Sequence, residues 1–317
     1  MIVLLGATGY IGEAFAAALE KRQWPFVVMR RSEVDYTSFP LILDYLQGIR
    51  PAFLINCAGY TGKPNVDACE SAKADTLQGN TLFPINLAHA CALTKTPWGH
   101  VSSGCIFSGA KVSDASGVHA EKNLLRPELK SGIETGAVAV RGYTELDLPN
   151  FSFRDPPYSF YSATKALAEE ALAGETNVYI WRLRIPFDHI DNPRNYLSKV
   201  QRYSKVYVNF NSLSHRGDFA SAALDLWDRR APFGTYNMTN PGFVTTRQVV
   251  EMLEGILKPD RKFEYWASDE EFYRVAASTP RSNCLLDVSK LLNAGVAMRS
   301  VEAALEDSLR NWVPQTR

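Results

Sequence analysis

Apolar and polar positions along the chain follow two alternating patterns. Short apolar runs rich in Val and Ile, typical of buried strands, recur through the first half of the sequence. They predict strands at Ile2–Leu5, Phe26–Met29, Phe53–Ile55, His100–Ser102 and Val178–Leu183. Between these runs, helical periodicity predicts helices at Ile11–Lys21, Pro40–Gly48, Leu77–Cys91 and Ser159–Ala173. Strands that alternate with crossover helices form a parallel sheet covered on both faces, so we expect an α/β fold with a doubly wound sheet.

The pattern changes after Pro186, where the elements become shorter. Further helices are predicted at Asn195–Tyr203, Phe219–Arg229, Thr246–Leu257 and Val301–Trp312, and at a capping-box spacing that begins at Ser268. Residues 109–150 are rich in Gly, Ser and charged positions without a firm period, which is typical of a long loop or insertion. We therefore expect a Rossmann-type dinucleotide-binding domain over residues 1–186, with an insertion at about 109–150, and a mainly substrate-binding α/β lobe over residues 187–317.

Charge and cysteine content narrow the class of partner. Among 317 residues, Lys plus Arg and Asp plus Glu number 34 each, so no net field favours nucleic acid or an anionic membrane. The five cysteines are scattered and predict reduced thiols without a metal site. No apolar run approaches the ~20 residues of a membrane helix. Because Met1–Leu5 already resembles a strand rather than a signal segment, we expect a cytoplasmic protein with a small-molecule partner.

A glycine-rich turn joins the first predicted strand to the first helix. Gly6, Gly9 and Gly12 have the spacing of a dinucleotide-binding loop, where they permit a tight turn, approach of a pyrophosphate and close packing of helix on strand. The helix N-terminus would supply amide donors to the phosphates. An ordinary structural turn is the alternative. The cofactor residues predicted here are Gly6, Thr8, Gly9, Tyr10, Ile11 and Gly12.

Two arginines follow the second predicted strand, where an acidic residue would normally hold the ribose of NAD. Arg30 and Arg31 suit a 2′-phosphate, because a guanidinium matches phosphate oxygens with two hydrogen bonds. NADP is therefore the expected cofactor and NAD the alternative. Two solvated surface arginines would explain the pattern equally simply. Asp35 could meet the adenine edge or cap the next helix.

The catalytic prediction combines a Tyr-x-x-x-Lys spacing with a serine at a strand end. Tyr161 and Lys165 would share one face of a helix, where the ammonium lowers the pKa of the phenol and can hold the cofactor ribose. Such a phenol can exchange a proton with a carbonyl oxygen while hydride moves to the carbon. Ser103 ends the fourth predicted strand at the carboxyl edge of the sheet and would bind the same oxygen. Tyr158 has no lysine four residues later.

Six segments in chain order resemble the extended short-chain dehydrogenases. Within that group they are similar to the dTDP-4-dehydrorhamnose reductase family, and most of all to plant-type nucleotide-rhamnose synthases, which are 3,5-epimerase/4-reductases. The resemblance covers nearly the whole chain. The matching segments are Asn56–Asp67, Ser103–Phe107, Ser159–Lys165, Asn192–Asn195, Thr239–Gly242 and Pro280–Asn283.

The resemblance implies NADPH-dependent reduction of carbon 4 of a nucleotide-diphospho-4-keto-6-deoxyhexose, giving a nucleotide-6-deoxy sugar such as L-rhamnose. Ser103, Tyr161 and Lys165 would be catalytic. Relatives often pair through helices that flank the sheet, which would give a homodimer. A surface ion pair is the alternative role of Arg281. Further cofactor contacts are implied for Asn56, Cys57, Ala58, Gly59, Tyr60, Asn80, Arg184, Ile185 and Pro186, and substrate contacts for Ser103, Cys105, Asn195, Arg281 and Asn283.

Cys105 lies two residues after Ser103, where related enzymes that epimerise sugar carbons next to a ketone have an acid/base cysteine. Epimerisation would also need a base on the opposite face. Lys199 is the first choice for that base and Arg194 the second. The alternative is that Cys105 is simply a small buried residue.

The sequence departs from the plant-type pattern near the predicted site. The stretch between Gly109 and Asn150 is longer than expected, and Phe153–Pro157 is inserted before the tyrosine. Two other functions are considered: a nucleotide-sugar 4-epimerase or dehydratase that recycles its nicotinamide, and a non-catalytic NADP-binding regulatory subunit. Gly104 and Cys105 stand where a dehydratase needs an Asp-Glu pair, which disfavours elimination.

Overall fold

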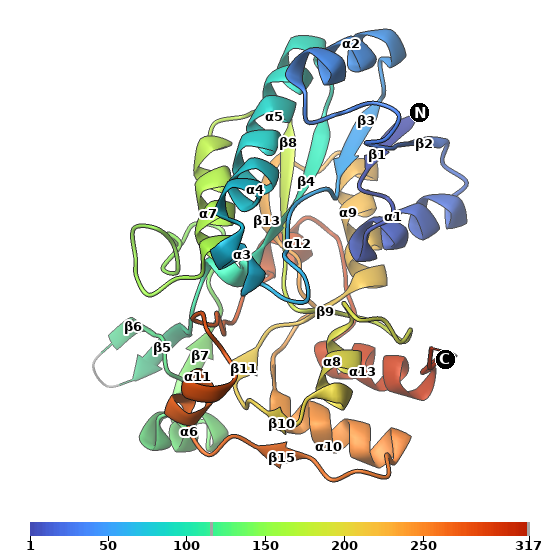
Figure 1. Ribbon diagram of the computed structural model, residues 1–317. Coiled ribbons are helices and arrows are strands. Elements are labelled where there is room, and N and C mark those ends of the chain that lie inside the picture. Colours follow the sequence, from blue (N-terminus) through green and yellow to red (C-terminus); the bar gives the residue numbers. More distant parts are fainter. Residues whose placement is uncertain (115–116, 316–317) are drawn as a thin grey trace.

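The computed structural model describes residues 1–114 and 117–315 and has a parallel six-stranded sheet as its centre (Figure 1). The strand order is β13-β8-β4-β3-β1-β2, with Leu5 opposite Asn56 and Ser103 opposite Leu183. All its pairs are parallel, as the alternation of strands and helices predicts. The strands are β1 (Ile2–Leu5), β2 (Phe26–Met29), β3 (Phe53–Asn56), β4 (Trp98–Ser103), β8 (Val178–Leu183) and β13 (Gly234–Asn237).

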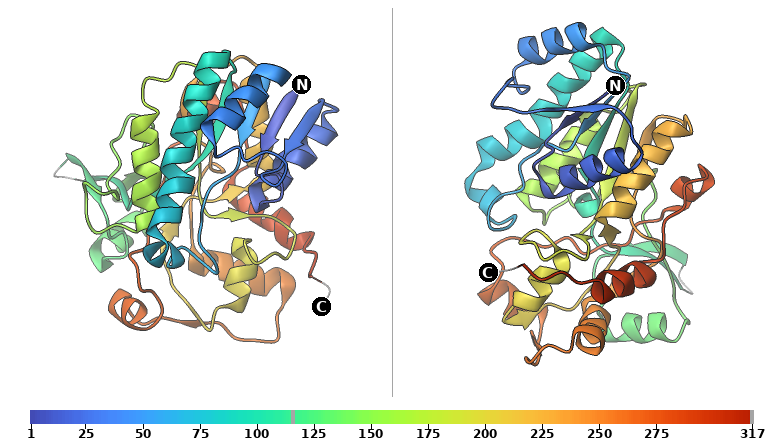
Figure 2. Two further views of the ribbon diagram at one scale, coloured as in Figure 1. Left: turned by 45° about the horizontal axis from the view of Figure 1, so that its top comes forward. Right: turned by 90° about the vertical axis from the view of Figure 1, so that its right-hand side faces the viewer.

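Helices cover both faces of this sheet (Figures 1 and 2). On one face, Phe15 stacks on Trp181 with ring centroids 5.6 Å apart and meets Phe219 edge to face at 5.9 Å. On the other face, Leu46 and Leu87 are fully buried in a second core. The helices are α1 (Tyr10–Lys21) and α9 (Arg216–Asp228) on the first face, and α2 (Phe39–Ile49), α5 (Phe83–Thr94) and α7 (Phe160–Ala171) on the second. The doubly wound α/β prediction is confirmed.

The sheet and its helices form one layer of the molecule. A second layer, made of short strands and helices, lies beyond the carboxyl ends of the parallel strands and has its own hydrophobic core. Phe187, Leu197, Val249 and Leu305 are buried together there. Its elements are β9 (Pro186–Phe187), α8 (Tyr196–Arg202), β10 (Lys205–Val206), β11 (Phe210–Asn211), β12 (Ser214–His215), β14 (Val244–Thr245), α10 (Thr246–Leu257), β15 (Glu264–Tyr265), α11 (Asp269–Val275) and α13 (Val301–Arg310). The short α12 (Ser289–Asn293) instead packs on β13 of the main sheet and buries Leu291 in the core of the first face. Ser268 caps α11 by accepting the Glu271 amide, as its spacing predicts.

The segment beyond residue 186 contributes to both layers. β13 pairs with β8 at the edge of the main sheet, and α9 packs on α1. The sequence did not predict β13, because a four-residue edge strand with a Gly, a Thr and an Asn has neither an apolar run nor a clear alternation. Substrate-lobe residues and sheet residues are therefore interleaved along the chain.

Residues 109–150, predicted as a long loop or an insertion, contain three strands and a helix, so the loop alternative is wrong. β5 (Ala110–Asp114) pairs antiparallel with both β6 (Gly117–Glu121) and β7 (Ala139–Arg141), and α6 (Pro127–Glu134) packs beside them. Alternation is visible only along β5, where Ala110 and Val112 are buried, whereas the side chains of β6 are mostly exposed. A sheet with one solvated face carries too few apolar positions for the sequence pattern to show it.

Candidate active site

The end of β4 and the start of α7 bring the three predicted catalytic side chains together. Ser103 is the last residue of β4, while Ser159 caps α7 by accepting the Ser162 amide at 3.1 Å. Tyr161 and Lys165 lie one turn apart on the first half of that helix. Lys165 is buried, and its Nζ donates to the Val101 carbonyl oxygen at 3.2 Å. The arrangement places a phenol, an ammonium and a hydroxyl at the carboxyl edge of the sheet, where sites of open α/β folds lie.

The surroundings of this group shift both titratable side chains. Burial lowers the pKa of Lys165 to about 8, while the Cys105 thiol and the Glu169 carboxylate act in the opposite direction. Burial and Cys105 raise the pKa of the Tyr161 phenol, and hydrogen bonding to Ser103 lowers it. The pKa of the phenol is thus raised, against the prediction that the Lys165 ammonium lowers it, because burial outweighs the effects of the charged groups. The phenol is protonated at neutral pH, which is the form that can donate a proton.

Hydrogen bonds to Asn80 fix the backbone of the segment that follows β3. Asn80 donates from Nδ2 to the Tyr60 carbonyl oxygen at 2.8 Å and accepts the Tyr60 amide at 2.9 Å. A Cβ placed on Gly59 would lie 3.1 Å from Asn80 Oδ1 and 3.6 Å from Lys165 Nζ, so the segment approaches Lys165 closely. Gly59 thus lies beside Lys165. The cofactor contacts of Cys57, Ala58, Gly59 and Tyr60 stay predictions.

Asn80 lies in a π-helical turn that the sequence pattern did not predict. Helical periodicity predicts one helix over Leu77–Cys91, whereas the structure has α4 (Lys73–Leu77), a π-turn at Gln78–Leu82 and then α5. The short α3 (Ala68–Ser71) precedes them. π-turns often occur at functional sites. Here the turn carries buried Asn80 and Thr81, and the Thr81 hydroxyl donates to the Thr164 carbonyl oxygen of α7 at 2.8 Å.

The glycine loop has the geometry of a phosphate cradle. Gly6 has a φ of +73°, a conformation that favours glycine, and a Cβ there would lie 2.6 Å from the Ala58 nitrogen. A Cβ on Gly12 would lie 2.1 Å from the Gly6 carbonyl oxygen, a distance too short for any residue with a side chain. Gly9 is the N-cap of α1, and no side chain caps it. The cradle therefore fits the pyrophosphate of a dinucleotide.

Within the loop, Tyr10 turns toward the second layer. Its hydroxyl donates to Asp188 Oδ1 at 2.9 Å, and the Arg216 guanidinium lies 4.3 Å from its ring centroid. Thr8 and Ile11 flank Gly9 at the start of α1. Cofactor contacts of these three residues stay predictions.

Arg30 and Arg31 lie beyond the end of β2, with 58% and 67% of their side chains exposed. Arg30 pairs with Glu33 at 3.0 Å, and Arg31 with Asp35 at 3.4 Å. Exposed pairs of this kind contribute little free energy, so a phosphate could displace the carboxylates at small cost. Asp35 does not cap α2, whose N-cap is Ser38.

We expect the double substitution Arg30→Gln and Arg31→Gln to weaken NADPH about tenfold or more and to leave NADH affinity nearly unchanged, because charge-assisted hydrogen bonds to the 2′-phosphate are lost. Fluorescence titration with both nucleotides measures the change. Arg50→Gln, at the far end of α2, is the matched control. Equal losses for the two nucleotides would contradict a 2′-phosphate site.

Hydrogen bonds and an ion pair hold several of the predicted site residues that follow β8. Arg281 forms a two-pronged ion pair with Asp67, at 2.5 and 2.7 Å, so the alternative of an ion pair is realised in this structure. Buried Arg184 donates to Asn211 at 2.7 Å and to the Ser282 carbonyl oxygen. Asn283 accepts from Asn211 Nδ2 at 3.1 Å. Ile185 has a φ of +39°, in the turn between β8 and β9.

Asn195 is fully buried and committed to local structure. It caps α8 by accepting the Leu197 amide at 3.0 Å, and its Nδ2 donates to the Asp188 and Ile190 carbonyl oxygens at 2.8 and 2.7 Å. Its substrate contact stays a prediction, and the geometry favours a supporting role for Asn195. The sequence already contained the signal, because Asn is a preferred N-cap residue.

Cys105 is buried in a single 3₁₀ turn, η2 (Gly104–Ile106), directly after Ser103. Its amide donates to Ser103 Oγ at 3.3 Å, which ties the two side chains to one turn. Lys199 is half-buried on α8, and burial together with Arg194 lowers the pKa of its amine. The positive charge of Arg194 acts to lower the pKa of the Tyr161 phenol, and its guanidinium donates to the Gly62 carbonyl oxygen at 2.8 Å. Of the two predicted base candidates, Arg194 lies close enough to influence Tyr161, and the role of Lys199 stays a prediction.

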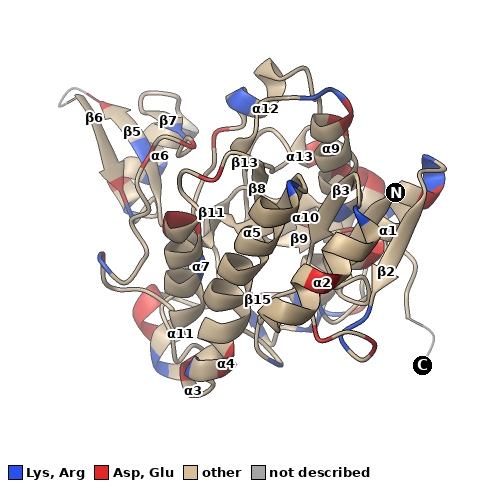
Figure 3. Ribbon diagram, turned by 90° about the horizontal axis from the view of Figure 1, so that it is seen from above, with Lys and Arg blue, Asp and Glu red and all other residues tan. Residues whose placement is uncertain are grey.

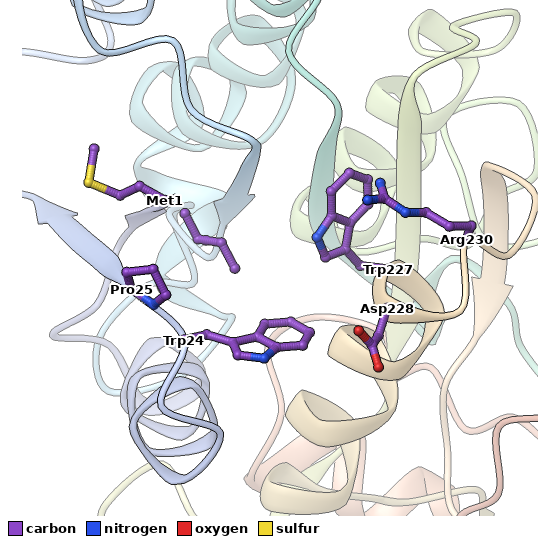
Figure 4. A pocket seen from close by; sticks show the side chains of 7 residues that line it. Met1, Trp24, Pro25, Trp227, Asp228 and Arg230 are labelled. Atoms are coloured by element: carbon purple, nitrogen blue, oxygen red, sulfur yellow. The ribbon is translucent and has the colours of Figure 1, made fainter.

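A hollow at the opposite edge of the sheet carries none of these residues (Figure 4). Trp24 and Trp227 line it together with Met1, Pro25, Asp228 and Arg230. It lies at the amino ends of β1 and β2, away from Ser103. Acidic and basic side chains are interspersed along the elements, in keeping with the balanced charge (Figure 3).

Two other kinds of site are absent from residues 1–114 and 117–315. Within these ranges, no helix combines the length and apolar character needed to span a bilayer. No group of three or more His, Cys, Asp or Glu side chains in them is placed to hold a metal ion.

The fold and the Ser103, Tyr161 and Lys165 arrangement define a Rossmann-type protein with a short-chain-dehydrogenase-like site. The chain belongs to the family described as RmlD substrate binding domain, which it matches over residues 1–313. The resemblance to dTDP-4-dehydrorhamnose reductases is thereby confirmed at the level of the family.

Two relatives from Arabidopsis thaliana are similar over most of this chain. One is a bifunctional dTDP-4-dehydrorhamnose 3,5-epimerase/dTDP-4-dehydrorhamnose reductase, 30% identical over 96% of this chain and 90% of its own length. The other is a trifunctional UDP-glucose 4,6-dehydratase/UDP-4-keto-6-deoxy-D-glucose 3,5-epimerase/UDP-4-keto-L-rhamnose-reductase, 33% identical over 96% of this chain. The chain spans only 41% of the length of that trifunctional relative.

Two solved structures share the fold. The L780 UDP-rhamnose synthase of Acanthamoeba polyphaga mimivirus has a TM-score of 0.81 at 22% identity and covers 98% of both chains. A dTDP-4-dehydrorhamnose reductase of Bacillus anthracis, in complex with NADP, has a TM-score of 0.74 at 19% identity and covers 98% of this chain and 97% of its own.

Proposed function

We propose that the protein is an NADPH-dependent reductase of a nucleotide-diphospho-4-keto-6-deoxyhexose of the dTDP- or UDP-4-dehydrorhamnose type. The observation that carries the proposal is the meeting of Ser103, Tyr161 and Lys165 beside a glycine cradle at the carboxyl edge of the sheet. The bifunctional and trifunctional relatives, whose names contain reductase activities of this type, support the substrate class.

The residues of this chain have distinct tasks in that reaction. NADPH, when bound, supplies the hydride for carbon 4. Tyr161 donates its proton to the carbonyl oxygen, which is where negative charge develops as carbon 4 is reduced. Ser103 donates a hydrogen bond to the same oxygen and orients it. Lys165 holds the ribose and keeps a positive charge near the phenol, which favours loss of the phenolic proton.

Epimerisation at carbons 3 and 5 before reduction forms a second part of the proposal. A proton on a carbon next to the ketone is acidic, and inversion needs a base on one face and an acid on the other. Cys105 lies beside Ser103 and can act on one face. Lys199 of α8 is the proposed base for the other face, and its lowered pKa increases the fraction of neutral amine, the form that accepts a proton.

Arg281 is the proposed contact for the diphosphate of the substrate. The Arg281 side chain is 22% exposed and its guanidinium makes two hydrogen bonds to Asp67, so a diphosphate can replace the Asp67 carboxylate as its anionic partner. We expect Arg281→Leu to raise the KM for the nucleotide-sugar about tenfold or more, with a much smaller change in kcat. Steady-state kinetics measure this, with Arg274→Leu on α11 as control. An unchanged KM would leave Arg281 with a structural role only.

An activity panel tests the proposed function. The protein is incubated with NADPH and, in turn, dTDP- and UDP-linked 4-keto-6-deoxy sugars, and both nucleotide oxidation and the sugar product are followed. Stoichiometric oxidation of NADPH with formation of a 6-deoxy sugar is expected. Sugar conversion without net NADPH consumption would indicate a 4-epimerase, and NADPH binding without any conversion would indicate a regulatory subunit.

A further inference from the structure

A buried carboxylate lies one helical turn beyond the predicted lysine. Glu169 follows Lys165 by four residues and Tyr161 by eight, so the three side chains share one face of α7. Only 7% of the Glu169 side chain is exposed. Glu169 belongs to none of the segments from which the catalytic site was predicted.

Two partners fix both oxygens of this carboxylate. Arg182 of β8 donates from Nε and Nη2 to Glu169 Oε2 at 2.9 and 2.7 Å, and Ser102 of β4 donates from Oγ to Oε1 at 2.5 Å. Arg182 is itself held, because Nη1 reaches Asn237 Oδ1 at 3.5 Å and its guanidinium lies 5.2 Å from the Phe107 ring centroid. The carboxylate therefore has a single defined position.

Three consecutive residues at the end of β4 contact three successive turns of α7. The Val101 carbonyl oxygen accepts from Lys165, Ser102 binds Glu169, and Ser103 interacts with Tyr161. The hydrogen bond between Ser102 and Glu169 is therefore one of three contacts that fix the distance between the end of β4 and α7. A buried ion pair adds little net stability compared with apolar packing, so stability alone does not explain it.

Charge is the second part of the argument. Lys165 and Arg182 are two buried cations close to one buried anion. Glu169 raises the pKa of Lys165, while burial lowers it. His100 does not compensate, because burial and Lys165 lower its pKa well below the usual value and it is neutral. The other titratable groups facing this pair are Cys105, Tyr161, Cys284, Glu145 and Lys290.

We propose that Glu169 is a positioning residue, which holds Lys165 in its charged form and α7 in register with the end of β4 while Arg182 and Ser102 clamp it. This inference rests on the proposed function, since it assigns the role through Lys165.

The test compares Glu169→Gln with Glu170→Gln, a neighbouring exposed glutamate paired with Arg154. In Glu169→Gln, Lys165 should lose its proton at lower pH, so the alkaline limb of the kcat profile should move to lower pH by about half a unit or more. At pH 8.5 we expect kcat to fall about threefold, because a half-unit shift of one titration changes the protonated fraction by at most about threefold, with recovery toward the wild-type rate near pH 6. Glu169→Asp, which keeps the charge, should restore the wild-type profile, and Glu170→Gln should match it throughout.

A second measurement does not depend on turnover. The affinity for NADPH is followed by fluorescence between pH 6 and 9.5. As the pH rises, the affinity of Glu169→Gln should begin to fall at a lower pH than that of the wild type, because the charged ammonium holds the ribose. If Glu169→Gln does not fold, Glu169→Gln with Arg182→Met removes the uncompensated buried guanidinium and takes its place in both measurements.

The outcomes separate the two proposals. A wild-type protein without reductase activity overturns the proposed function, and the NADPH titration still tests Glu169. A folded Glu169→Gln protein whose two pH profiles coincide with those of the wild type overturns the inference and leaves the proposed function intact.

Discussion

Replacing Tyr161 by Phe is expected to lower kcat by about 10²–10⁴-fold and to leave NADPH affinity within about twofold. The substitution removes the proton donor and keeps the ring, which lies at the start of α7 next to Ser103. Because the glycine cradle and Lys165 are unchanged, the cofactor should still bind. Single-turnover reduction of the 4-keto sugar measures the loss, and fluorescence titration measures the binding.

Tyr158→Phe is the matched control for that experiment. Tyr158 lies on the segment before α7 and packs edge to face on Phe153, with ring centroids 5.2 Å apart. Its hydroxyl is not part of the Ser103 and Lys165 arrangement, so turnover should be close to that of the wild type. Full activity of Tyr161→Phe would contradict the proposed proton transfer.

Replacing Cys105 by Ser is expected to lower proton exchange at carbons 3 and 5 by about 10²-fold or more, because a hydroxyl is a much weaker acid than a thiol. Incubation of the 4-keto sugar in heavy water without NADPH, followed by mass spectrometry, measures the exchange. Reduction of a substrate that already has the product configuration at both carbons should change only a few-fold, since Tyr161 and Ser103 remain.

Two further variants complete the Cys105 experiment. Lys199→Met should lose exchange in the same way if it is the base on the opposite face. Cys91→Ala, a substitution on the buried face of α5, should exchange at the wild-type rate. No exchange by the wild-type protein would rule out epimerase activity and leave the reductase proposal standing. A homodimer and a cytoplasmic location stay predictions.

Local sequence was sufficient for the parts of the fold that depend on neighbours along the chain. The strand predictions at Ile2–Leu5, Phe26–Met29 and Val178–Leu183 match the structure residue for residue. Ile2–Leu5 and Phe26–Met29 are continuous apolar runs, and Val178–Leu183 is interrupted only by Arg182, because helices cover both faces of a parallel sheet. The glycine loop was also predictable, since the spacing of Gly6 and Gly12 reflects contacts within one turn.

Elements that depend on distant partners were not predictable in the same way. β13 forms because β8 offers it an open edge, and β5 to β7 form because they pair with one another across a long excursion. The π-turn at Gln78–Leu82 is tied to Thr164 and Tyr60, which lie far away in sequence. Hydrophobic periodicity reports the burial of a position and does not identify the residue that covers it.

The sequence by itself determined the sheet core, the phosphate cradle and the identities of Tyr161 and Lys165, whose spacing of four places them together on any helix. Tertiary structure decided which side chains surround them. Asp67 pairs with Arg281, which lies 214 residues later in the sequence, and Ser102 binds Glu169, which lies 67 residues later. The side chain of Asn195 caps α8. Hydrogen bonds and ion pairs act over a few ångströms, so their partners are fixed only when the fold brings the two segments to that distance.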